Sequence, residues 1–247
     1  MRFSKYYDTD TESETNTVVS EPDFPLMQDE DDDEDENENP PIPRDRFREL
    51  VRDVCTWSYS CDDYRQFGPI EDWNVRLIRD MSGTFLEYPY FDEDISGWNT
   101  SNVTDMSNMF SGATSFNQNI GKWNVSKVTT MSCMFWRAER FNQDLSAWNT
   151  SAVTDMSFLF HGAKDFDQPL ESWNVSKVES MYGMFSYAES FNHPLTRWDV
   201  TGVKDVTSMF ARATSFQQSL ASWSLGAGIR RNKMLDAEFR GIPPTFI

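Results

Sequence analysis

Tryptophan recurs every 25 residues along most of this 247-residue chain, and this period constrains the fold more than any other feature. Phenylalanine and methionine keep the same period. A recurrence of this kind identifies a repeat array, and periods of 20–50 residues are typical of solenoids, propellers and similar stacks. The tryptophans that keep the period are Trp73, Trp98, Trp123, Trp148, Trp173, Trp198 and Trp223.

Two shorter periodicities alternate within each unit. Ile95, Trp98 and Thr100 follow a spacing whose last two members alternate as in a strand. The apolar residues of the next segment, 103–113, are spaced by three or one, which predicts a short helix. The fold class expected is therefore α/β: a right-handed solenoid of six to seven turns, each with a short parallel strand and a short helix.

Stacking explains how so short a unit can fold. One strand and one short helix cannot bury their apolar side alone, whereas adjacent turns can bury it against each other. The periodic tryptophans should then form one ring ladder, and the asparagine after each tryptophan a polar ladder that bonds the backbones of adjacent turns. A second ring ladder is expected from Phe110, Phe135, Phe160, Phe185 and Phe210.

Charge and pattern divide the chain into four segments. Fifteen acidic and two basic residues fall within residues 1–40, so most of the net charge of −18 belongs to the N-terminus. We expect residues 1–43 to be a disordered acidic tail and 44–72 to be an N-terminal cap helix with a lead-in. Residues 73–223 would form the solenoid, and 224–247 a C-terminal cap.

The remaining composition argues against several functions. Outside the tail no basic stripe exists, so nucleic-acid binding is not expected, and no apolar run is long enough to cross a membrane. Two histidines and three cysteines leave little material for catalysis, and we expect no enzyme, cofactor or metal. Cys55 and Cys61 would form a disulfide in an exported protein and would stay free thiols otherwise.

An interrupted acidic row recurs at Asp80, Asp105, Asp155 and Asp205. Calcium needs six to eight oxygens around one ion, and carboxylates two turns apart cannot share one. The pattern therefore favours charge stabilisation at helix N-termini over a metal site.

Ligand-binding candidates come from positions that break the repeat. In the middle turns, aromatic residues replace the small or polar residues found at most equivalent positions, as a binding hot spot requires. Scattered aromatics on separate faces are the alternative. The candidates are Trp136, Phe158, His161, Tyr182 and Tyr187.

The repeat resembles the BspA-like surface-protein family, a divergent leucine-rich repeat. The resemblance rests on residues 123–135 and 148–160, each followed by an alanine and a Phe-Asn-Gln or Phe-Asp-Gln turn. It implies a leucine-rich-repeat-like fold and binding or adhesive roles without enzymatic activity.

The function expected is non-catalytic binding of a protein or a glycan by a monomer. A purely structural spacer and an intracellular interaction scaffold are the alternatives. The compartment stays open, because the N-terminus shows no apolar signal segment, which predicts a cytoplasmic protein, whereas the resemblance predicts the cell surface.

Overall fold

The computed structural model describes residues 39–235, 241 and 243–246. The chain divides into two units, Met1–Glu36 and Asn37–Ile247, and the described residues all belong to the second. The expected disordered tail lies outside the described residues, except for its last five positions.

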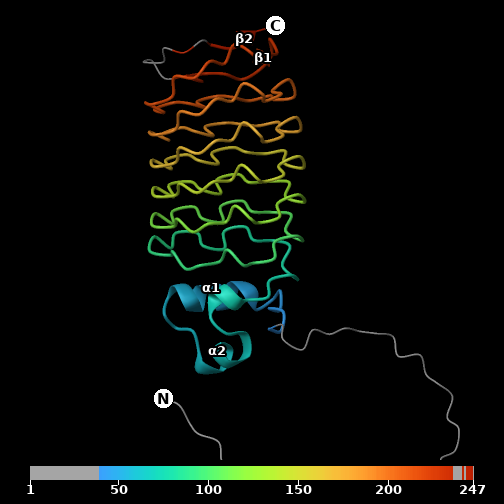
Figure 1. The fold of residues 1–247 in the computed structure, drawn as a ribbon, viewed down its shortest axis with the longest axis vertical. Coiled ribbons are helices and arrows are strands. Elements are labelled where there is room, and N and C mark those ends of the chain that lie inside the picture. Colours follow the sequence, from blue (N-terminus) through green and yellow to red (C-terminus); the bar gives the residue numbers. More distant parts are fainter. Residues whose placement is uncertain (1–38, 236–240, 242, 247) are drawn as a thin grey trace, which may run out of the picture. The chain divides into compact units, whose positions relative to one another are not determined.

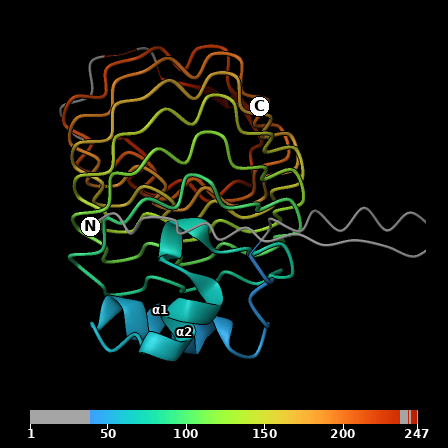
Figure 2. The same ribbon diagram turned by 60° about the horizontal axis from the view of Figure 1, so that its bottom comes forward.

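From residue 73 onward the chain winds through coils of equal length that lie one on another (Figures 1 and 2). Parallel bridges join equivalent residues of consecutive coils, from Asp80–Asp105 through to Asp205–Arg230. The bridges follow the acidic row, so the expected strand at the tryptophans is misplaced: the backbone there forms turns. The leucine-rich-repeat-like class itself stays a prediction.

The expected short helix in each unit is wrong. Among the described residues beyond 73, the backbone of each coil forms a series of turns instead. In the coil 106–113, the amides of Met109, Ser111 and Ala113 donate three residues back along the chain. The alternate amides donate to carbonyls of the next coil, at 2.7–3.2 Å; they belong to Met106, Asn108, Phe110 and Gly112.

Left-handed residues explain why the apolar spacing misled. Asn108 has a φ of 56° and Gly112 a φ of 75°, and equivalent residues repeat these values in the other coils. An α-helix requires negative φ throughout, so a left-handed residue at every fourth position turns amides out toward the next coil. The apolar spacing of three then comes from consecutive turns, each of which is closed by a bond three residues back.

The aromatic residues stack in the interior of the coils. Trp73–Trp98, Trp98–Trp123, Trp148–Trp173 and Trp198–Trp223 have centroids 6.1–6.4 Å apart and nearly parallel planes. The phenylalanines from Phe85 to Phe210 stack at 5.4–5.7 Å. Each indole N–H also donates to a backbone carbonyl of the preceding coil, as Trp148 Nε1 does to the oxygen of Ile120 at 3.1 Å.

The polar ladder lies elsewhere than expected. The asparagine after each tryptophan bonds locally: Asn99 Oδ1 accepts from the amide of Ser101, within the same turn. The ladder is formed instead by the residue after the second phenylalanine of each unit. Asn117 Oδ1 accepts from the amide of Asn142 at 2.9 Å, and Asn142 Oδ1 from the amide of Asp167 at 3.0 Å.

The two ends of the stack carry different caps. Helices α1 (Phe47–Cys55) and α2 (Cys61–Phe67) and the 3-10 turn η1 (Ile70–Asp72) precede the first coil, and α1 buries Phe47, Leu50 and Val51. At the other end, β1 (Ser224–Leu225) pairs in parallel with β2 (Thr245–Phe246).

The boundary of the N-terminal tail needs correction. Ile42 is fully buried, and its amide donates to the carbonyl of Asn74 at 2.9 Å. The side chain of Asn74 in turn donates to the carbonyl of Asn39 at 3.0 Å. Residues 39–43 therefore belong to the cap and not to the tail.

Replacing Trp148 with phenylalanine should lower the free energy of unfolding by about 2–4 kcal/mol, since it leaves the buried Ile120 carbonyl unpaired and opens a cavity. Urea denaturation measures this loss. Trp136→Phe, at a half-exposed tryptophan, is the matched control and should cost less than about 1 kcal/mol. Equal losses in the two variants would contradict the role given to the indole bond.

Candidate functional site

The five candidate residues lie together in one connected cluster. The rings of Trp136 and His161 are nearly parallel, with centroids 5.8 Å apart. His161 also meets Tyr187 and Phe158, each at 5.4 Å. Phe158 packs edge-on against Tyr182 at 4.6 Å. The alternative of scattered aromatics on separate faces is thus wrong for this set.

The register between coils brings these residues together. Trp136 and His161 occupy equivalent positions of consecutive coils, where the flanking coils carry Ser111 and Ser186. Tyr187 occupies the next position along its coil, which glycine holds in two of the others. Because hydrogen bonds fix the coils in this register, substitutions 25 residues apart become neighbours in space.

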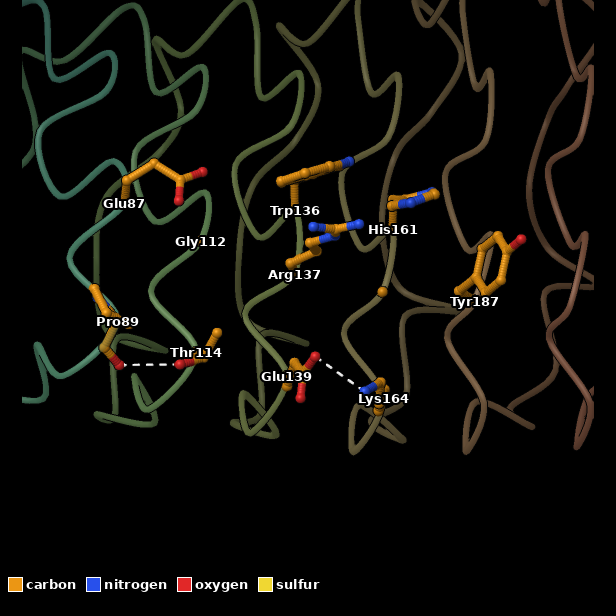
Figure 3. Close-up of a pocket in the computed structure, with 11 residues that line it drawn as sticks. Glu87, Pro89, Gly112, Thr114, Trp136, Arg137, Glu139, His161, Lys164 and Tyr187 are labelled. Carbon is orange, nitrogen blue, oxygen red and sulfur yellow. Dashed lines mark hydrogen bonds and ion pairs between the residues drawn. The ribbon is translucent and has the colours of Figure 1, made fainter.

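Three of the five candidates line a groove of about 650 Å³ (Figure 3). The groove extends across five coils, from Glu87 to Tyr187, along three adjacent columns of equivalent positions. Phe158 and Tyr182 are not among its lining residues; Phe158 supports His161 by the edge contact. The other lining residues are Pro89, Gly112, Thr114, Trp136, Arg137, Glu139, His161, Gly162 and Lys164.

Two glycines give the groove its depth. Both Gly112 and Gly162 have positive φ, near 70°. A Cβ on Gly112 would lie 2.8 Å from the carboxyl carbon of Glu87, and one on Gly162 would lie 3.3 Å from Cγ of Arg137. The glycines therefore alternate with larger residues along one column and leave space beside Arg137 on both sides.

Charges of both signs line the groove. The Arg137 guanidinium lies 4.5 Å from the centre of the Trp136 ring, in a cation–π contact. Along the lower edge in Figure 3, Lys164 forms an ion pair with Glu139 at 2.9 Å. Glu87 lies at one end of the groove, on the far side of Gly112 from Arg137. A ligand therefore meets aromatic rings, a carboxylate and a guanidinium along one line.

His161 is the one titratable ring at the centre of this cluster. Burial lowers its pKa below the ordinary 6.5, and the positive charge of Arg137 lowers that pKa further. Its Nδ1 atom is buried and has no hydrogen-bond partner among the described residues. The imidazole is therefore neutral at pH 7 and offers a ring nitrogen for a ligand to bond.

Sequence reasoning missed the charged half of the groove. Arg137 and Glu87 belong to a column that contains Glu, Gly, Arg, Gly, Tyr and Arg in successive coils. Glu139 and Lys164 belong to another variable column two residues further along. Variation at a fixed position of the repeat marks both columns, whereas aromatic character marks only part of the groove.

The other candidates have structural roles. The acidic row does not lie at helix N-termini, since no helix begins there; Asp105 Oδ1 instead accepts from the amide of Ser107 within a turn, at 2.8 Å. Within residues 39–235, 241 and 243–246, no group of three or more histidine, cysteine or acidic side chains is placed to hold a metal ion. Cys55, Cys61 and Cys133 are free thiols.

The pKa of His161 yields a prediction about pH. Because this pKa is lower in the folded protein than in the unfolded chain, the unfolded chain binds more protons as the pH falls through 6.5. Acid should therefore weaken folding, and His161→Gln should remove part of that loss between about pH 7 and 5. Unfolding midpoints in urea, measured across this pH range, test the difference.

Arg137→Gln separates the two causes of the shift. With only two histidines in the chain, the His161 ring can be followed by proton NMR as the pH is changed. Removal of the neighbouring positive charge should raise its titration midpoint. An unchanged midpoint would show that Arg137 does not act on this ring.

Comparisons with known proteins give one result. A family model described as "Mycoplasma protein of unknown function, DUF285" matches residues 55–159 and, a second time, residues 143–240. No curated protein and no solved structure matches the chain. Among the helices that the structure describes, none has the length and apolar character needed to cross a bilayer.

Proposed function

The chain belongs to this DUF285 family, and we propose that it is a non-catalytic binding protein whose ligand lies in the groove between Glu87 and Tyr187. One observation carries the proposal. The side chains that interrupt the repeat in the middle coils come together on one face and line a single hollow, whereas the internal ladders are nearly uniform. Clustered aromatic and arginine side chains are typical of binding hot spots.

The groove suits an extended peptide better than a glycan. Neighbouring coils are about 4.8 Å apart, so the five coils span roughly 19 Å, the length of about six residues in an extended chain. Glu87 and Arg137 would pair with one basic and one acidic side chain of such a peptide. A sugar ring instead needs an open aromatic face, and the Arg137 guanidinium covers one face of Trp136.

The resemblance to BspA-like repeats supports two finer parts of the proposal. We infer a leucine-rich-repeat-like solenoid, built from turns instead of helices, and an adhesive role at a cell surface. The near-uniform ladders equally suit a structural spacer, in which the groove would bind nothing specific. An intracellular scaffold would use the same groove for a different partner.

Reverting the groove to the residues of the other coils tests the proposal. In the triple variant Trp136→Ser, His161→Ser and Tyr187→Gly, each new residue already occupies an equivalent position elsewhere in the chain. The variant should therefore fold with an unfolding midpoint close to that of the wild type. Random peptides selected on the wild-type protein should lose at least about tenfold in affinity, since hot-spot residues contribute about 2 kcal/mol or more each.

The controls decide between the alternatives. Ser111→Ala, at the same column in a coil without an aromatic residue, should leave peptide affinity unchanged. A glycan array screened with both proteins tests the other ligand class. If selected peptides and glycans bound the wild type and the triple variant equally, the groove would not be the binding site, and the spacer role would stand.

A further inference from the structure

A second hollow, of about 190 Å³, lies between the end of α1 and the loop 88–93. Aromatic side chains of Trp57, Tyr88 and Tyr90 line it, together with Val54, Cys55 and Glu93. Trp57 is 91% exposed and Tyr90 is 90% exposed. Large apolar side chains are rarely left this open to water, and two beside one hollow indicate a binding surface.

Trp57 holds a position that normally belongs to glycine. The amide of Ser58 donates to the carbonyl of Asp53 at 2.8 Å, and the amide of Trp57 to that of Val54 at 3.2 Å. These two bonds define the Schellman motif that ends α1, in which the residue at the position of Trp57 is left-handed and usually glycine. The φ of Trp57 is indeed 59°.

The folded state gains little from a tryptophan at this position. A bulky residue with positive φ is strained, and a ring that remains 91% exposed gains little burial in return. Strain without compensation by burial points to a role in binding. The ring has a further asset, because Trp57 also lines an adjoining hollow with Tyr59, Tyr64 and Glu71, so contacts are available on more than one side.

The charges around Trp57 favour a cation. Glu93 lines both hollows, and Glu71 lines the second. Burial raises the pKa of the Cys55 thiol to about 12, and the nearby charge of Glu93 contributes to this rise, so the thiol stays neutral. Arg52, on the same helix, is paired with Asp53 at 3.1 Å.

We propose that this hollow binds a quaternary ammonium cation of the choline type. Such a cation is attracted to the faces of tryptophan and tyrosine and to a carboxylate. It also has no N–H groups that need acceptors, which suits a hollow lined by apolar and aromatic side chains with one carboxylate. The site is separate from the peptide groove and does not depend on the ligand of that groove.

Titration of the full chain with choline, followed by saturation-transfer NMR, tests the proposal. The control ligand is 3,3-dimethylbutan-1-ol, which has the shape of choline without its charge. Choline should bind with a roughly millimolar Kd and the neutral alcohol about tenfold more weakly. Equal binding of the two, or no binding of choline, would overturn the proposal.

Trp57→Gly separates binding from stability. Glycine relieves the left-handed strain, so the thermal midpoint should stay the same or rise while choline binding is lost. Glu93→Gln should weaken choline binding without affecting the neutral alcohol. Trp136→Ser, in the groove, is the matched tryptophan control and should leave choline binding unchanged. Full choline affinity in Trp57→Gly would contradict the assignment.

Discussion

The hydrogen bonds between coils are the constraint on which the rest of this structure depends. Alternate amides of each turn series donate to the following coil, and a left-handed residue at every fourth position makes this geometry possible. Each buried amide is thus paired without a helix or an extended strand, as a buried backbone requires. The same bonds hold the period at 25 residues, and this fixed register places the aromatic rings and the asparagines in ladders.

A fixed register also explains how binding surfaces arise on a uniform scaffold. Interior positions must stay nearly constant, because each ring packs on its equivalents above and below. Exposed columns carry no such requirement, so a few changes 25 residues apart, such as Trp136, His161 and Gly162, create a groove without altering the backbone. Trp57 in the N-terminal cap follows the same principle, since its backbone is held by the end of α1 and its ring is left free.

The 25-residue period is enough to place residues in space, but it does not identify the backbone. The period alone puts Trp136, His161 and Tyr187 in neighbouring coils. The helix predicted in each unit is wrong because bonds three residues back give the same apolar spacing as a helix, and the left-handed Asn108 or Cys133 leaves no strong mark in the sequence. Arg137 and Glu87 escape prediction because their importance lies in a column of varying residues, and the polar ladder because two asparagine columns compete for that role.

Deletion of one whole coil tests the central claim most directly. Removal of residues 189–213 joins equivalent positions of two units and leaves every groove residue in place. If register alone holds the stack, this shorter protein should unfold cooperatively and keep its affinity for the selected peptides. Removal of 189–214, one residue more, shifts the register of all that follows and should destabilise the C-terminal part of the stack. Equal stability of the two deletion proteins would contradict the account.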